Sequence, residues 1–182
     1  NPIINGKAFS KAELLADLES FSDTTSFNEV LKAEAGKATH DLHPYIGYVM
    51  ADCCNANKYG LYGPDPLDEE LTDYYKVAIV GGSVAAGLFG HAHYKLEELI
   101  QQSGIAGDKP VTSFCLAVQG NKQPQQIMAL SWMLSMGANF DLVINLDGFN
   151  EIVLPLTDNK VAKIHSTYPR NWQMYARKGI NM

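Results

Sequence analysis

The sequence predicts an α/β domain in which helices cover a parallel β-sheet. Three short apolar runs rich in β-branched residues, at 76–80, 111–118 and 141–146, have the length and composition of buried strands. Segments with a helical spacing of apolar residues follow the first two runs, at 84–102 and 124–136. Strands that alternate with helices form parallel sheets with helices on both faces, so we expect a three-layer arrangement.

The predicted domain occupies residues 41–182 and follows a helical N-terminal extension over 1–40. Apolar residues at helical spacing predict two short helices between Ser10 and Ala35. Residues 40–75 are rich in turn formers, so we expect irregular structure there. Tyr45 and Tyr48 are candidates to line a substrate cleft, and the alternative is that this segment simply wraps around the domain. Only about 30 residues follow Glu151 and they show no further strand and helix, so we expect the domain to be incomplete at its C-terminus.

Composition narrows the classes of partner. The chain has 182 residues, of which 46 % are hydrophobic and 19 % charged, as in globular proteins. A net charge of −6 argues against nucleic acid, and no apolar run approaches the roughly 20 residues of a membrane span. Cys53, Cys54 and Cys115 suggest neither a disulfide framework nor a metal site. The compartment stays open between cytoplasmic and periplasmic or extracellular.

The candidate site lies where the predicted strands end, because ligands of open parallel sheets bind at the carboxyl ends of the strands. Ser83 follows the first strand and precedes a helix, which exposes its hydroxyl at the positive end of the helix and suits a nucleophile. Gly120 follows the second strand and Asn150 the third. The amides of Ser83 and Gly120 and the side chain of Asn150 are candidate donors to an oxyanion.

These blocks together resemble the SGNH (GDSL-like) hydrolase superfamily, in which a Ser, a Gly, an Asn and a His occupy successive blocks on a flavodoxin-like sheet. The matching segments are GGS at 81–83, AVQG at 117–120 and DGFNE at 147–151. HPYIGY at 43–48 also resembles a segment that precedes the nucleophile block in one bacterial branch. The resemblance extends from Leu42 to Leu154. Gly82 stands where the family often has Asp, and Glu151 replaces the last Asp of the third block.

The resemblance implies a serine esterase or acetylesterase that hydrolyses an O-acyl ester of a small molecule or a carbohydrate, without a cofactor. Ser83 would be the nucleophile, and Ser83, Gly120 and Asn150 would form the oxyanion hole. The family's base lies in a late DxxH block, which this sequence lacks. His165 is the only histidine after Asn150, and its alternative interpretation is an ordinary surface histidine. We therefore leave the base unassigned and expect a further segment or a partner chain to complete the domain.

Two other functions remain as alternatives. A catalytically inactive SGNH-like domain would bind a carbohydrate or a protein, which the missing histidine block favours. A dinucleotide-binding module is the other, but Ser83 stands at the second glycine of the GxGxxG pattern. Each site residue also has a structural interpretation: Ser83 as a helix N-cap, Asn150 as a turn former and Gly120 as a tight turn.

Overall fold

The structure is a computed structural model that describes residues 3–4, 7–8, 40–51 and 56–170. The two helices predicted between Ser10 and Ala35, and most of the predicted extension over 1–40, lie outside the described residues. Within that extension, β1 (Ile3–Ile4) and β2 (Lys7–Ala8) pair as a short antiparallel ladder.

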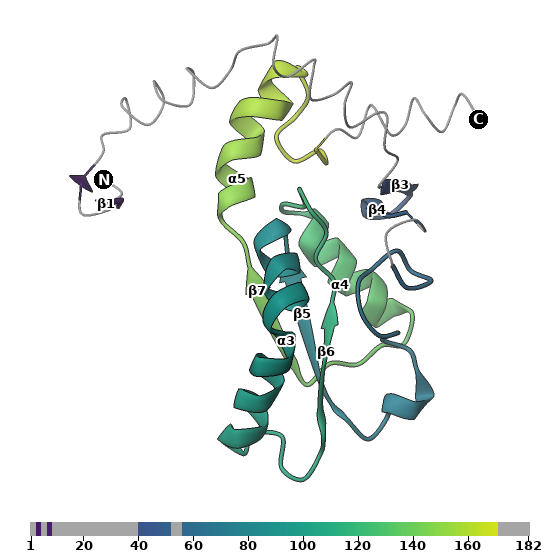
Figure 1. Cartoon of the computed structure of the whole chain (residues 1–182). Helices are drawn as coiled ribbons and strands as arrows, with labels where there is room; N and C mark the ends of the chain where they lie inside the picture. The colour runs from purple at the N-terminus through teal and green to yellow at the C-terminus, as the bar shows by residue number, and fades with distance from the viewer. Residues whose placement is uncertain (1–2, 5–6, 9–39, 52–55, 171–182) are drawn as a thin grey trace.

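The centre of the described domain is a parallel sheet of three strands in the order β6-β5-β7 (Figure 1). Its strands are β5 (Tyr75–Gly81), β6 (Val111–Cys115) and β7 (Leu142–Leu146). Val77 of β5 pairs with Ser113 on one side and with Leu142 on the other. The three predicted strands are therefore present, and the α/β class is confirmed.

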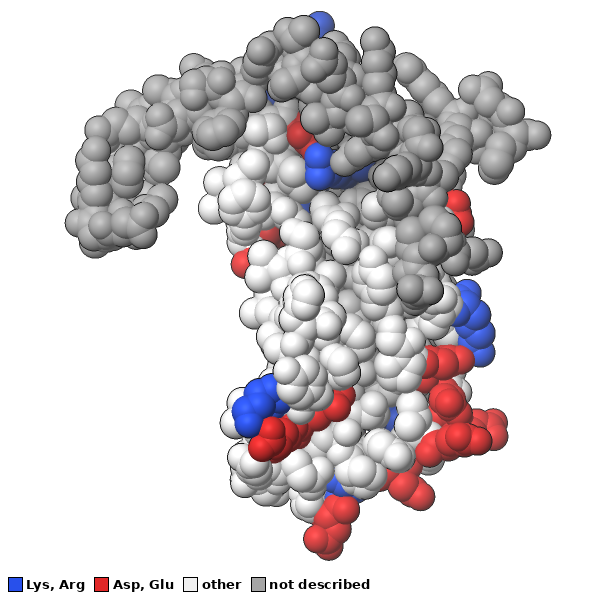
Figure 2. All heavy atoms as spheres, in the orientation of Figure 1, with Lys and Arg blue, Asp and Glu red and all other residues white. Residues whose placement is uncertain are grey.

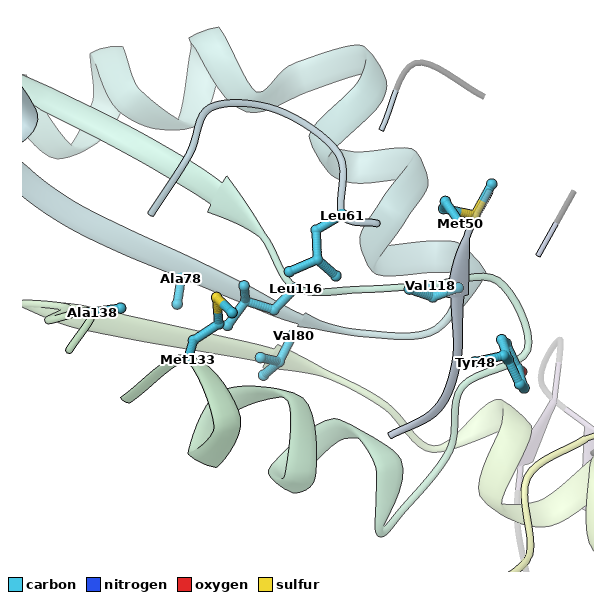
Figure 3. Packing of buried hydrophobic residues seen from close by; sticks show 9 residues of the cluster. All are labelled: Tyr48, Met50, Leu61, Ala78, Val80, Leu116, Val118, Met133 and Ala138. Carbon is cyan, nitrogen blue, oxygen red and sulfur yellow. The ribbon is translucent and has the colours of Figure 1, made fainter. Parts of the chain in front are cut away.

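Helices α3 (Ser83–Ser103) and α4 (Gln125–Ser135) pack on opposite faces of this sheet. Because side chains alternate along a strand, Ala78 and Val80 of β5 face Met133 of α4, whereas Ile79 faces Ala85 of α3. Figure 3 shows the cluster on the α4 face, to which β5, α4, the segment after β6 and the preceding hairpin contribute. The helix boundaries differ from the predicted ones by one residue at each end.

A β-hairpin corrects the prediction that residues 40–75 are irregular. β3 (His40–His43) pairs antiparallel with β4 (Gly47–Met50), and the latter is fully buried. Nδ1 of His43 accepts the backbone N–H groups of Tyr45 and Ile46, at 3.2 and 3.1 Å, and so closes the turn. The turn formers of this segment connect two strands that are too short to form a long apolar run in the sequence.

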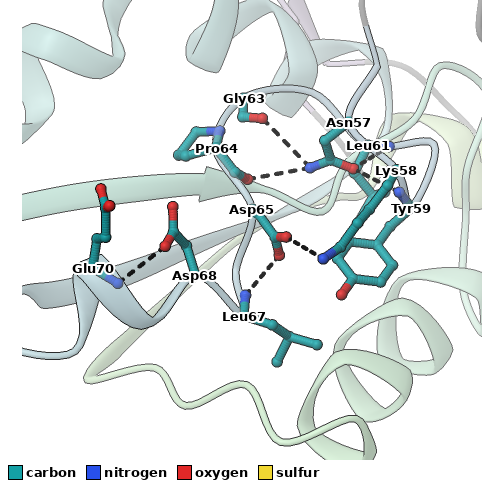
Figure 4. Close-up of polar contacts among 10 residues, drawn as sticks. All are labelled: Asn57, Lys58, Tyr59, Leu61, Gly63, Pro64, Asp65, Leu67, Asp68 and Glu70. Carbon is teal, nitrogen blue, oxygen red and sulfur yellow. Dashed lines mark hydrogen bonds and ion pairs between the residues drawn. The ribbon is translucent and has the colours of Figure 1, made fainter.

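The rest of that segment, from Ala56 to Tyr74, is irregular as predicted, apart from a 3₁₀ helix at Glu69–Leu71. Side chains replace a backbone ladder here (Figure 4). Oδ1 of Asn57 accepts the N–H groups of Tyr59 and Leu61, and its Nδ2 donates to the carbonyls of Gly63 and Pro64. These contacts fold the segment against the sheet, where Leu61 is buried.

After β7 the chain forms α5 (Phe149–Leu154), which continues into a π-helical turn at Pro155–Asn159. None of the described helices is both long and apolar enough to cross a membrane. Acidic side chains predominate over the lower half of the face shown in Figure 2, in keeping with the net charge of −6.

Candidate functional site

The loops that follow the three strands meet at the place where the sequence predicts the site. Because β5, β6 and β7 are parallel neighbours, the segments that follow them emerge at one edge of the sheet (Figure 1). Only Gly82 separates β5 from α3 there, and two residues, Asp147 and Gly148, separate β7 from α5. The loop from Leu116 to Pro124 connects β6 to α4 at the same edge.

Two glycines allow the ends of β5 and β7 to approach closely. Gly81 has φ +153°, and a Cβ on it would lie 2.3 Å from the carbonyl oxygen of Leu146. Gly82 has an ordinary φ of −101°, but its Cβ would lie 2.2 Å from Nδ2 of Asn150. A side chain at either position therefore collides with the residues at the end of β7 or the start of α5. Space alone requires glycine at 82, whereas Gly81 is required by its positive φ as well.

Ser83 is the first residue of α3, and its side chain is exposed. It lines a pocket of about 140 Å³ together with residues from the other two strand ends: Gly82, Val84, Gln126, Leu146, Asp147, Phe149, Asn150 and Glu151. The N–H groups of the first helical turn lack partners within a helix, and α3 is 21 residues long, so its positive end faces this pocket. The serine is thus placed where a developing negative charge is stabilised.

Asn150 lies beside Ser83 in the same pocket, and its side chain is held in place. Its Nδ2 donates to the backbone carbonyl of Asn121 at 2.7 Å, which links the β7 end to the β6 end. A carboxamide has two N–H donors, so this bond fixes the group and leaves a second donor.

Gly120 does not line the pocket. It is buried with φ +80°, and a Cβ on it would lie 3.0 Å from the Tyr48 hydroxyl and 3.2 Å from Cδ of Arg170. Tyr48 is 2 % exposed and donates to the carbonyl of Gln119 at 3.2 Å, so it supports this loop from the core side instead of forming an open wall. Tyr45 is 47 % exposed and is also absent from the pocket lining.

No histidine lines the pocket that holds Ser83. His165, the remaining candidate base, is exposed, and its Nδ1 is 2.9 Å from Oγ1 of Thr167. His43 closes the hairpin turn, and burial lowers its pKa. Burial also lowers the pKa of His40, whose ring packs edge-on against Tyr48, and the nearby Arg170 lowers it further. The structure thus brings Ser83 and Asn150 together without a described histidine beside them.

Glu151 joins the loops in a way that the sequence did not reveal. Its Oε1 accepts the backbone N–H of Gln123 and Nε2 of Gln126, both at 2.9 Å. Its Oε2 accepts the backbone N–H of Gly148 at 2.7 Å. One carboxylate therefore clamps the β6 loop and the start of α4 to the start of α5. The only sequence signal was the glutamine-rich segment QPQQ at 123–126, which follows the glycine block.

A second set of polar contacts holds the segment that covers Gly120. Lys122 is buried, and its Nζ donates to the carbonyls of Ser166 and Tyr168. Burial lowers the pKa of this lysine, while the carboxylate of Glu151 acts in the opposite direction. Arg170 forms an ion pair with Asp158, with 2.5 Å between Nε and Oδ2. These contacts fix residues 166–170 over the loop after β6.

The described residues include no group of three or more His, Cys, Asp or Glu side chains that could hold a metal ion. What the pocket does offer is a hydroxyl at a helix N-terminus, a fixed carboxamide and two carboxylates. Comparisons with protein-family models, with curated proteins and with solved structures find no match to this chain.

Proposed function

We propose that the chain is an SGNH-type serine hydrolase that cleaves an O-acyl ester, with Ser83 as the nucleophile. The observation that carries the proposal is the pocket that Ser83 shares with Asn150, at the carboxyl edge of a parallel sheet. The order of the strands along the chain, and the Ser, Gly and Asn blocks that follow them, agree with the same proposal.

In the proposed reaction Oγ of Ser83 attacks the acyl carbon, and the alcohol of the ester leaves. The carbonyl oxygen then carries negative charge, which the Ser83 amide and the second Nδ2 hydrogen of Asn150 stabilise. Water subsequently releases the acid from the serine. Gly120 is buried outside the pocket, so its amide completes the donor set only if this loop moves.

The serine proton needs an acceptor, and the pocket carboxylates are poor candidates. Both oxygens of Glu151 already accept N–H groups. Oδ2 of Asp147 accepts Nδ2 of Asn145 at 2.9 Å and Nε2 of Gln123 at 3.2 Å. We propose that the base comes from a segment other than the described residues, in this polypeptide or in a partner chain.

Labelling with a fluorophosphonate probe tests the nucleophile directly. We expect a single modification that peptide mass spectrometry assigns to Ser83, loss of labelling in Ser83→Ala, and full labelling in Ser135→Ala. Ser135 is an exposed serine at the far end of α4 and serves as the matched control. Labelling that persists in Ser83→Ala contradicts the assignment of the nucleophile. Absence of both labelling and ester hydrolysis supports the catalytically inactive binding domain instead.

A further inference from the structure

The pocket beside Ser83 has apolar walls that the hydrolytic reaction itself does not use. Val84 and Phe149 line it and remain 67 % and 68 % exposed, and the half-buried Leu146 lines it as well. Ile152, 63 % exposed, lies three residues after Phe149 and so continues the apolar surface on the same side of α5. Single exposed apolar residues are common on proteins, but a cluster around a pocket indicates a binding surface.

The charges of the pocket indicate what kind of group these walls accept. Among the described residues that line it none is Lys or Arg, whereas Asp147 and Glu151 both contribute carboxylates. The Glu151 carboxylate accepts three N–H groups and interacts with the protein's own Lys122, so it does not need a cation from the substrate. The positive end of α3 acts on the reacting carbonyl beside Ser83, whereas a carboxylate further along the acyl group would meet the like charges of Asp147 and Glu151.

The volume sets the length of the acyl group. A pocket of about 140 Å³ is far larger than an acetyl methyl group requires. For comparison, an engineered apolar cavity of about 150 Å³ binds benzene, which has six carbons. A short aliphatic chain of about four to six carbons therefore fits between Val84, Leu146 and Phe149.

We infer that this pocket binds the uncharged aliphatic acyl chain of its ester, and that the preferred acyl group is butyryl to hexanoyl rather than acetyl. The inference rests on the proposed function. Burying one methylene fully strengthens binding about fourfold, and a half-open pocket gives about twofold. Four additional methylenes should then raise kcat/KM from acetyl to hexanoyl esters by roughly 10-fold to 20-fold.

The test measures kcat/KM for p-nitrophenyl acetate, butyrate and hexanoate, with the rate of Ser83→Ala subtracted. We expect the wild type to prefer hexanoate and Phe149→Ala to lose most of that preference. Ile105→Ala is the matched control, because Ile105 is 63 % exposed but follows the other end of α3. Hydrolysis with acetate as the best substrate, or an unchanged chain-length profile in Phe149→Ala, overturns the inference and leaves the hydrolase proposal intact.

A binding measurement separates the two proposals if no ester is cleaved. The Phe149 ring resonances are followed by NMR while hexanamide or acetamide, which are neutral and lack an ester, is added to Ser83→Ala. Tighter binding of hexanamide, by roughly 10-fold, supports the acyl pocket even where hydrolysis is absent and the proposed function fails. Equal effects of the two amides overturn the acyl pocket. Thermal unfolding of Phe149→Ala should match that of Ile105→Ala, since both side chains are exposed.

Discussion

Replacing Glu151 by Gln tests whether one carboxylate holds the candidate site together. The carboxylate accepts three N–H groups at 2.7 to 2.9 Å, from Gln123, Gln126 and Gly148. A carboxamide keeps one acceptor oxygen and presents an NH₂ group where the second oxygen was, so at least one of these donors loses its partner. A hydrogen bond to a charged group contributes about 1.5–3 kcal/mol, and a neutral one about 1 kcal/mol.

The expected cost follows from these values. Glu151→Gln loses one charge-assisted bond and weakens two others, but the half-buried site lets water compensate in part. We therefore expect the free energy of unfolding to fall by about 2 kcal/mol, which corresponds to a decrease of about 1 M in the urea midpoint. Glu98→Gln is the control: Glu98 bonds Lys95 and Gln102 at the exposed surface of α3, so this substitution should leave the urea midpoint almost unchanged.

Urea unfolding of both variants gives the comparison, and amide hydrogen exchange locates the effect. In Glu151→Gln the backbone N–H groups of Gly148 and Gln123 should exchange faster, whereas the amides of β5 should change only with global stability. Equal urea midpoints for Glu151→Gln and Glu98→Gln would refute the clamp. Unchanged exchange at Gly148 and Gln123 would do the same.

Three further predictions concern other parts of the domain. Gly82→Ala should displace the Asn150 carboxamide, because the new Cβ would lie 2.2 Å from its Nδ2 and 2.9 Å from the carbonyl oxygen of Asn121. It should lower ester hydrolysis at least 10-fold and also lower stability in urea unfolding. Gly87→Ala, where a Cβ meets nothing within 4 Å, should retain full activity. His43 has a lowered pKa, so its folded form resists protonation and stability should fall as pH drops below about 6.5. His43→Asn, whose Oδ1 replaces the acceptor Nδ1, should weaken that dependence in urea unfolding at pH 5 and 7, with His40 contributing the remainder. Burial raises the pKa of the Cys115 thiol to about 11. Peptide mapping should therefore find Cys115 unmodified by a thiol reagent at pH 8 in the native protein and modified in urea. The free energy of unfolding should decline as pH rises from about 9 to 11, because the thiol ionises more readily in the unfolded chain.

The sheet and its two covering helices were predictable because their signals are local. Val77 to Val80 form a continuous apolar run, as expected for a strand that is buried on both faces, and the structure buries it so. The hairpin at 40–50 was missed for a related reason. β4 lacks a polar and apolar alternation because all four of its residues are buried, and β3 has only one apolar residue. Its signal lies in the turn, where a histidine side chain supplies the acceptor, and no sequence period reports that contact.

In the candidate site, too, some features were predictable from the sequence and others depend on long-range contacts. Ser83 and Asn150 were predictable because each lies within four residues of a strand end, and parallel strands end at one edge whatever their side chains are. Gly120 also follows a strand, but it is buried beside Tyr48 and Arg170, which lie 72 and 50 residues away in the sequence. The contacts of Glu151 depend likewise on a loop 28 residues earlier. Position along the chain thus predicts which groups reach the site, whereas long-range packing decides which of them are accessible.

At Gly82, position along the chain and long-range packing both matter. The family that the sequence resembles often carries Asp at this position, so glycine first reads as a departure from the motif. In the structure the absent side chain is what gives the Asn150 carboxamide its place, with the carbonyl of Asn121 only 2.9 Å from where a Cβ would be. A larger residue at 82 would require a different path for the loop after β6. Glycine at 82 and the bond from Asn150 to Asn121 therefore depend on each other. A variant with a side chain at 82 should remain active only if the β6 loop changes with it.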